Sequence, residues 1–337
     1  MRSRESLRCA LLCLAGWAVA ACDNTGTGPN NPTSPTSLQL QSDAGDYIGV
    51  GRTYTYTQAN AVITVTANAA HLSIGIRGDE WWFGDFQGPS AASRLEPGPY
   101  VDLQRYPFDD PAKGGLSWSG EGRGCNTLSG GFTVDSVTYV GDALTAIDLS
   151  FEQHCEGATA ALHGTIHWRA DDTTTPPGPV KTIPADLWRP APGATPATGR
   201  YIYLSSDVGD YIGFGNTYTY TPANATISVG ANAGYLGVSI NGAQWWSGSF
   251  QAMNSLTQLQ TGYYGDLRRY PFHNPAKGGL DWWGEGRGCN TLVGWFAVDH
   301  VTYVHDSLTA IDMRFEQHCE GDLAALHGQI HWTATGN

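Results

Sequence analysis

Two short motifs that occur twice in this chain limit what it can fold into. Residues 120–128 read GEGRGCNTL and residues 151–157 read FEQHCEG, and both motifs return unchanged at 284–292 and 315–321. The offset between the copies is constant (289 − 125 = 164), and about two-thirds of the paired residues are identical, so the chain contains two copies of one unit. Each unit is about 130 residues long, and we therefore expect each copy to bury a core of its own.

The cysteines predict one disulfide in each copy. Of the seven cysteines, three lie near the N-terminus (Cys9, Cys13 and Cys22) and four lie in the repeats (Cys125, Cys155, Cys289 and Cys319). Four cysteines allow three pairings, and two self-contained repeats favour Cys125 with Cys155 and Cys289 with Cys319 over exchange between the copies. Each bridge would close a loop of about thirty residues and contribute roughly 3.5 kcal/mol.

The hydrophobic pattern predicts an all-β fold. Glycine, tryptophan and tyrosine are abundant, charged residues are few, and no amphipathic helical stretch stands out. Apolar residues alternate with period two in segments bounded by Asn, Gly or Asp. In the first copy the candidate strands are 53–57, 61–67, 72–76, 81–87, 101–106, 116–121, 131–140, 144–155 and 162–169. Such short, regularly spaced strands indicate two tandem antiparallel β-sandwich domains, jelly-roll-like, each with one intradomain disulfide.

The N-terminus has the features of an export signal. Arg2, Arg4 and Arg8 precede an apolar run at 9–21 that is too short for a permanent transmembrane helix. The run ends in VAAC at 19–22, which resembles the lipobox of bacterial lipoproteins. The resemblance implies a signal peptide at 1–21, lipidation of Cys22 and an exported protein that is lipid-anchored in the bacterial cell envelope. The alternative is an ordinary secretory signal that contains a cysteine.

Composition divides the rest of the chain into domains and connections. Residues 22–37 lack apolar residues that could build a core and are expected to form a flexible tether. Repeat 1 is placed at 38–170 and repeat 2 at 201–334, with a linker rich in Pro and Thr at 171–200 between them. Leu187 and Trp188 in this linker are candidates for packing back onto a domain.

A tryptophan in the hairpin around residues 77–80 is the first candidate for ligand binding. Antiparallel pairing places Trp82 in the core and Trp81 on the exposed face, beside Arg77 and Asp85. In the second copy Trp245 lies beside Asn241. The flat face of an indole can stack on the C–H face of a sugar while polar neighbours bind its hydroxyls. The alternative is that Trp81 packs under the loop at 88–99.

A second candidate is a row of histidines and acids across another hairpin. In the first copy Asp148, His163 and His167 share one sheet face; in the second copy the same positions are Asp312, His327 and His331. These residue types could bind a divalent metal. A row of hydrogen bonds between imidazoles and carboxylates that needs no metal explains the same pattern.

The repeated motifs supply two further candidates. Glu121 with Arg123, and Glu285 with Arg287 in the second copy, are predicted to form an ion pair or ligand contacts; the alternative is a structural pair at a crowded strand crossing where glycine lets backbones approach. The acidic segments at 42–47 and 206–211 could hold Ca²⁺, the one cofactor considered, or form turns capped by aspartate.

The formal net charge of −13 argues against a nucleic-acid partner, because phosphate binding requires clustered Lys and Arg. The membrane is expected to be contacted only through the lipid anchor, and the chain is expected to be a monomer.

The body resembles an uncharacterised domain of exported bacterial proteins that carries the motifs GRGCNTL and FEQHCEG, and this resemblance implies no activity.

The leading hypothesis is a surface-tethered, lectin-like binding protein whose tandem domains gain avidity for glycans. No nucleophile elbow, zinc-protease motif or catalytic triad context occurs, which disfavours an enzyme without excluding one. An alternative hypothesis is an envelope polysaccharide hydrolase that uses Glu121, Glu152 or the histidine row. A third hypothesis is a structural envelope lipoprotein that contacts other proteins.

Overall fold

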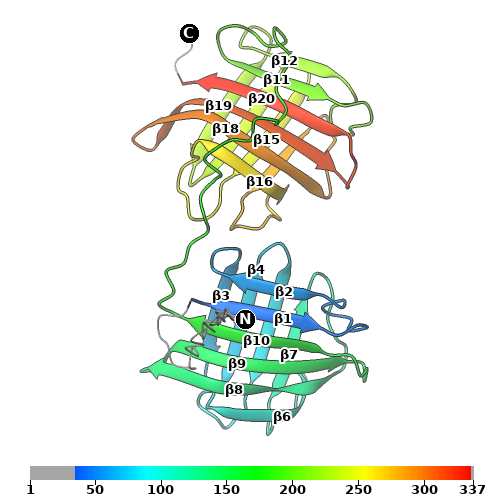
Figure 1. Cartoon of the computed structure of the whole chain (residues 1–337), viewed down its shortest axis with the longest axis vertical. Helices are drawn as coiled ribbons and strands as arrows, with labels where there is room; N and C mark the ends of the chain where they lie inside the picture. The colour runs from blue at the N-terminus through cyan, green and yellow to red at the C-terminus, as the bar shows by residue number, and fades with distance from the viewer. Residues whose placement is uncertain (1–34, 335–337) are drawn as a thin grey trace, which may run out of the picture.

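The computed structural model describes residues 35–334 and contains two all-β domains in tandem (Figure 1). The strands of the first domain are β1 (Ser37–Ser42), β2 (Thr53–Thr57), β3 (Val62–Asn68), β4 (His71–Arg77), β5 (Trp81–Gln87), β6 (Gly98–Arg105), β7 (Gly115–Gly120), β8 (Leu128–Val140), β9 (Ala143–Cys155) and β10 (Leu162–Arg169). Those of the second are β11 (Tyr201–Ser206), β12 (Thr217–Tyr220), β13 (Thr226–Asn232), β14 (Tyr235–Asn241), β15 (Trp245–Gln251), β16 (Gly262–Arg269), β17 (Gly279–Gly284), β18 (Leu292–Val304), β19 (Ser307–Cys319) and β20 (Ala325–Thr333).

Each domain is one hydrogen-bonded sheet that folds into two layers. The strand order is β2-β1-β10-β9-β8-β6-β7-β5-β4-β3, and the second domain repeats it. All neighbours pair antiparallel except β6 with β7 and β16 with β17, where only two residue pairs form. The sheet turns over at this weak junction, so one layer runs from β2 to β6 and the other from β7 to β3 (Figure 1). The predicted all-β tandem sandwich is therefore confirmed.

The core lies between the two layers and follows the predicted alternation. Trp82 and Trp118 are 0 and 1% exposed. Glycines make room for the aromatic rings: a Cβ on Gly84 would lie 2.3 Å from the Trp118 ring, and one on Gly164 would lie 2.0 Å from the Phe151 ring. The predicted registers of both hairpins are confirmed.

Both predicted disulfides are present, at Cys125–Cys155 and Cys289–Cys319. Beside the first one, the buried side chain of Gln153 accepts from the backbone N–H of Trp118 and donates to its carbonyl, each at 2.8 Å. A crosslink and a fully buried amide thus hold β9 to β7 and to the segment before β8.

Strand β1 was not among the predicted strands. Its Leu38 and Leu40 are 1 and 0% exposed because they belong to the core, and the strand pairs with both β2 and β10. The predicted tether therefore ends inside a strand, at Ser37. The predicted signal peptide, the lipobox with Cys22, and Cys9 and Cys13 lie outside the described residues. Residues 35–334 contain no helix long and apolar enough to cross a membrane.

The linker packs onto the second domain through Trp188, as predicted. The Trp188 ring stacks on His327 and Tyr203, with centroid separations of 4.9 and 6.4 Å. Farther upstream, Val180 forms a β-bridge with Tyr263. The linker is thus a part of the second domain's surface.

Candidate functional site

The outer face of β4, β5 and β7 in the first domain carries two aromatic side chains. Trp81 is half-buried and lies opposite Arg77, as predicted. Phe83, two residues farther along the same face, is 53% exposed and lies opposite Ser119. A hollow of about 430 Å³ lies between them and the turn at 120–123. We call this surface the aromatic face of domain 1.

The second domain carries a matching surface on β14, β15 and β17. Trp245 and Trp283 are 43 and 38% exposed, and their rings meet edge to face with centroids 5.3 Å apart. Trp245 lies opposite Asn241, as predicted. We call this surface the aromatic face of domain 2; its two indoles form perpendicular walls that a flat ligand could contact on two sides.

The two aromatic faces contain the same residue types on exchanged strands. The cross-strand pair Phe83 and Ser119 is replaced in the second domain by Ser247 and Trp283, so the aromatic residue has moved from the central strand to its neighbour. The next pair, Asp85 and Ser117, has likewise become Ser249 and Asp281. In both domains the face therefore has a leading tryptophan, a second aromatic ring and neighbouring serines. Each face also has one carboxylate, which is partly exposed in the first domain and buried in the second.

The carboxylate has different surroundings in the two domains. In the first, Asp85 lies 3.0 Å from Nε2 of His71, and both side chains are partly exposed. In the second, Asp281 is 8% exposed, and burial raises its pKa to about 6 although Arg269, 3.9 Å away, opposes the shift. Burial likewise lowers the pKa of His273, in the segment between β16 and β17, to about 4. At neutral pH, burial penalises the negative charge of Asp281 but spares the imidazole of His273, which is neutral there.

Trp81 also borders the contact between the domains. Asp79, in the turn before it, accepts hydrogen bonds from Lys277 at 2.8 Å and from Asn274 at 3.0 Å. These bonds outweigh the effect of burial and lower the pKa of Asp79. A hollow of about 360 Å³ there is lined by Trp81 and by second-domain residues, Phe272 among them, and by none of the loop at 88–99. The first tryptophan thus faces a cleft, whereas Trp245 faces open solvent.

The glutamate and arginine of the repeated motif make separate backbone contacts. The carboxylate of Glu121 accepts from the N–H of Trp81 at 2.8 Å, and Arg123 donates to the carbonyl of Ile48 at 2.7 Å. Glu285 and Arg287 make the same two bonds in the second domain. A Cβ on Gly120 would lie 2.2 Å from the Trp81 carbonyl oxygen, so the strands cross closely here. These contacts support the structural alternative, with Glu121 fixing the backbone of the exposed tryptophan.

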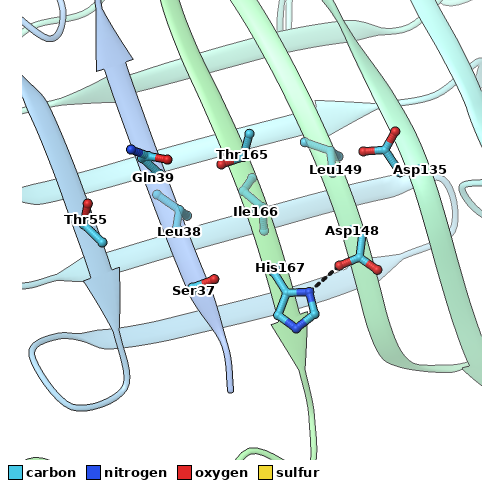
Figure 2. A pocket seen from close by; sticks show the side chains of 10 residues that line it. All are labelled: Ser37, Leu38, Gln39, Thr55, Asp135, Asp148, Leu149, Thr165, Ile166 and His167. Atoms are coloured by element: carbon cyan, nitrogen blue, oxygen red, sulfur yellow. Dashed lines mark hydrogen bonds and ion pairs between the residues drawn. The ribbon is translucent and has the colours of Figure 1, made fainter. Parts of the chain in front are cut away.

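The histidine row is divided between different carboxylates. Figure 2 shows His167 pointing to Asp148, with Nδ1 2.5 Å from the carboxylate. Asp148 also accepts from Arg169, and its hydrogen bonds outweigh burial and lower its pKa. His163 lies 3.2 Å from Glu152 instead. The structure therefore does not bring the two predicted histidines to one acid. In the described part of the chain, no three or more His, Cys, Asp or Glu side chains are arranged so that they could hold a metal ion.

In the second domain the equivalent residues follow the same division. His331 pairs with Asp312, while His327 lies 3.0 Å from Glu316. In the acidic segment at 42–47, Asp46 accepts from Ser42 and from the N–H groups of Ile48 and Gly49, as in an aspartate-capped turn.

Comparisons with protein-family models, with curated proteins and with solved structures match nothing to this chain. The function is therefore inferred from the two aromatic faces themselves. Sequence reasoning found Trp81 and Trp245 but missed Trp283 and Ser119. The alternation of Leu280 and Trp282 as inward residues was the signal that places Trp283 outside. That Trp283 lies opposite Ser247 could not be read from the sequence, because β15 and β17 are not consecutive.

Proposed function

We propose that this protein binds carbohydrate through the two aromatic faces, as an exported, lipid-anchored protein of the bacterial cell envelope. The observation that carries the proposal is the exchange of residues between strands. Phe83 and Trp283 are exposed, so nothing in the core requires that an aromatic ring lost from one strand be restored on the neighbouring strand. The restored ring, with a carboxylate that changed strands in the same way, supports selection for the chemistry of the face rather than for one residue.

The chemistry fits a sugar. Indole and phenyl rings stack on the apolar C–H face of a pyranose. Beside them, serine hydroxyls can donate hydrogen bonds to sugar hydroxyls and accept from them, and an ionised carboxylate can accept from them. Exposed aromatic patches of this kind also mark interaction sites in general. The polar side chains that border the rings are small, Ser119 in one domain and Ser247 in the other, which leaves the rings accessible.

Two faces on one chain favour a repetitive ligand. Linked sites gain avidity only when one ligand can reach both, and a long glycan with repeating units meets that condition. The faces are not equivalent, since one lies beside the cleft between the domains and the other faces solvent. We therefore expect the two sites to differ in affinity for the same glycan.

The test is a glycan-array screen of the full-length, detergent-solubilised chain, repeated with EDTA. Bound glycans are then titrated against Trp81→Ala, Trp245→Ala and the double variant. Each single change is expected to weaken binding about fivefold at its own site, since a stacking contact contributes on the order of 1 kcal/mol. The double variant is expected to retain no glycan.

Leu323→Ala is the matched control, because Leu323 is 94% exposed but lies outside both faces. Circular dichroism and thermal unfolding establish that each variant is folded. Unchanged glycan binding by the folded double variant would exclude the aromatic faces as the site. Loss of binding in EDTA would indicate that a metal takes part.

The lipid anchor is tested separately. Radiolabelled palmitate is expected to be incorporated in the bacterial host and to be lost in Cys22→Ser, with release of the protein from the membrane fraction. Retention of the label in Cys22→Ser would contradict lipidation at this residue.

A further inference from the structure

The opposite layer of the first domain presents a face that the second domain uses to hold its own linker. This face is the outer surface of β1, β10, β9 and β8, and in the second domain of β11, β20, β19 and β18. We call it the linker face. It is distinct from the aromatic face, which lies on the other layer of the sandwich (Figure 1).

In the second domain the linker face binds an extended segment through three kinds of contact. The Trp188 ring stacks on His327 at 4.9 Å with an interplanar angle of 13°. Arg314, only 1% exposed, donates from Nη1 to the Trp188 carbonyl at 2.7 Å. Asp299 accepts from Arg314 at 2.7 Å and lies 3.8 Å from Arg189 of the linker. An aromatic ring, a backbone carbonyl and a basic side chain are thus each recognised.

In the first domain two of the recognising residues remain but nothing described covers them. His163, the counterpart of His327, has a side chain 41% exposed, compared with 11% for His327. Asp135, the counterpart of Asp299, is exposed, and within residues 35–334 it makes no ion pair. Ser150 stands where the second domain has Arg314, so no arginine of the domain itself neutralises Asp135.

The first domain also has space where the second is filled. Ser37 and Gln39 on β1 replace Tyr201 and Tyr203, which are 7 and 8% exposed. The smaller side chains leave a hollow of about 330 Å³ that Figure 2 shows, with Gln39, Thr165 and Asp135 around it. The hollow, the exposed imidazole of His163 and the carboxylate of Asp135 lie on neighbouring strands of one face.

We propose that the linker face of domain 1 binds an extended peptide segment of a partner protein that carries an aromatic residue followed by a basic one. The aromatic ring stacks on His163 and reaches into the hollow, and the basic side chain pairs with Asp135. The tether before β1 does not supply these groups, because residues 23–34 contain neither an aromatic nor a basic residue. Once the predicted signal peptide at 1–21, which contains Trp17 and three arginines, is removed, the occupant must come from another polypeptide.

The chain's own linker sequence provides the probe. A synthetic peptide with the sequence of residues 183–193 (IPADLWRPAPG), in which a photoreactive phenylalanine analogue replaces tryptophan, is irradiated with the full-length chain in detergent. We expect a crosslink to β1 or β10 of the first domain, located by mass spectrometry. The unmodified peptide is expected to bind with a Kd on the order of 100 μM, because only a few side chains are recognised.

Three variants make the test specific. Asp135→Asn and His163→Ala are each expected to weaken peptide binding about tenfold, while Asp299→Asn, whose carboxylate is already occupied by Arg314, leaves it unchanged. A peptide with Ala in place of Trp is expected to bind at least tenfold more weakly. Asp135→Asn is a change at an exposed position and is expected to fold, which thermal unfolding checks.

The possible results of the crosslinking experiment distinguish a partner peptide from a second copy of this chain as the occupant of the linker face. A saturable crosslink at β1 or β10 that Asp135→Asn reduces supports the proposal. A crosslink confined to the second domain, or binding that Asp135→Asn does not alter, would overturn it. A dimer in sedimentation whose two chains exchange linkers would also overturn it, since the face would then be filled by a second copy.

Discussion

The same glutamate and two histidines occur on both linker faces, yet their exposure differs. In the first domain Glu152 is 54% exposed and pairs with His154 and His163. In the second, Glu316 is 21% exposed, pairs with His318 and His327, and accepts a further hydrogen bond from Trp295. Burial alone would raise the pKa of Glu316, but its three hydrogen bonds outweigh that effect and lower the pKa to about 2.

The difference in exposure comes from the residues around the glutamate and its two histidines, which are themselves the same in both domains. Trp295 replaces Gly131, and Trp188 of the linker covers His327. Duplication thus kept the polar residues and changed what covers them. In the first domain Glu152 and its histidines are accessible to a partner. In the second domain Glu316 and its histidines are covered and contribute to stability.

The largest expected effect tests whether the domains are independent. Replacing Cys125 and Cys155 by Ala is expected to lower the free energy of unfolding of the first domain by about 3.5 kcal/mol, because a loop of about thirty residues is no longer closed in the unfolded chain. The second domain should be unaffected, and the Cys289 and Cys319 variant should show the reverse. Urea unfolding followed by tryptophan fluorescence, which resolves the two transitions, provides the measurement. Equal loss in both domains from one pair would contradict independent folding.

The loss of stability at low pH provides a second comparison of the two linker faces. Because the pKa of Glu316 is lowered from 4.5 to about 2 on folding, its contribution is fully present above pH 4.5 and is lost as the pH falls toward 2. After allowance for solvent screening we expect about 1–2 kcal/mol, absent in Glu316→Gln. Thermal unfolding between pH 2 and 7 (~0.5 unit steps) measures it. The control is Glu152→Gln, whose more exposed site should show a smaller change; an equal change in both would contradict the comparison.

The buried carboxylate of Asp281 on the second aromatic face makes stability depend on pH in the direction opposite to Glu316. The folded-state pKa of Asp281 is raised from 3.8 to about 6, so the native state loses stability as the pH rises through this window. Asp281→Ser, which restores the residue of the first domain, is expected to stabilise the second domain by about 1 kcal/mol at neutral pH and by nothing below the ordinary pKa of aspartate. Unfolding midpoints across this pH range check the result, and a gain that is the same at every pH would exclude desolvation as its cause.

The smallest expected effect concerns the contact between the domains. Asp79→Ala introduces the residue found at the same place in the second copy, Ala243, and removes the partner of Lys277. Exposed ion pairs contribute little, so we expect Asp79→Ala to lower the free energy that couples the two domains by about 0.5 kcal/mol, which separates the two unfolding transitions by that amount. In high salt the substitution is expected to have no effect. A separation that persists in high salt would show that the contact is not electrostatic.

The sequence by itself determined the repeat, the all-β class, both disulfides, and the register of the hairpins that contain Trp81 and His163. These features are local, because a short turn fixes the pairing of two consecutive strands and alternation then assigns each side chain to a face. The cysteine pairing followed from the repeat, since each unit closes on itself. Even the docking of Trp188 was foreseen as an apolar residue in a polar linker.

Only the tertiary structure decided what depends on strands that are distant in the sequence. Strand β5 pairs with β7 rather than β6, which sets Phe83 opposite Ser119 and reveals the exchange with Ser247 and Trp283. Strand β1 owes its place to β10, more than a hundred residues later. Long-range pairing of this kind is selected by the burial of the whole sheet and has no signature in a local window. The covering of one linker face and the exposure of the other were decided in the same way.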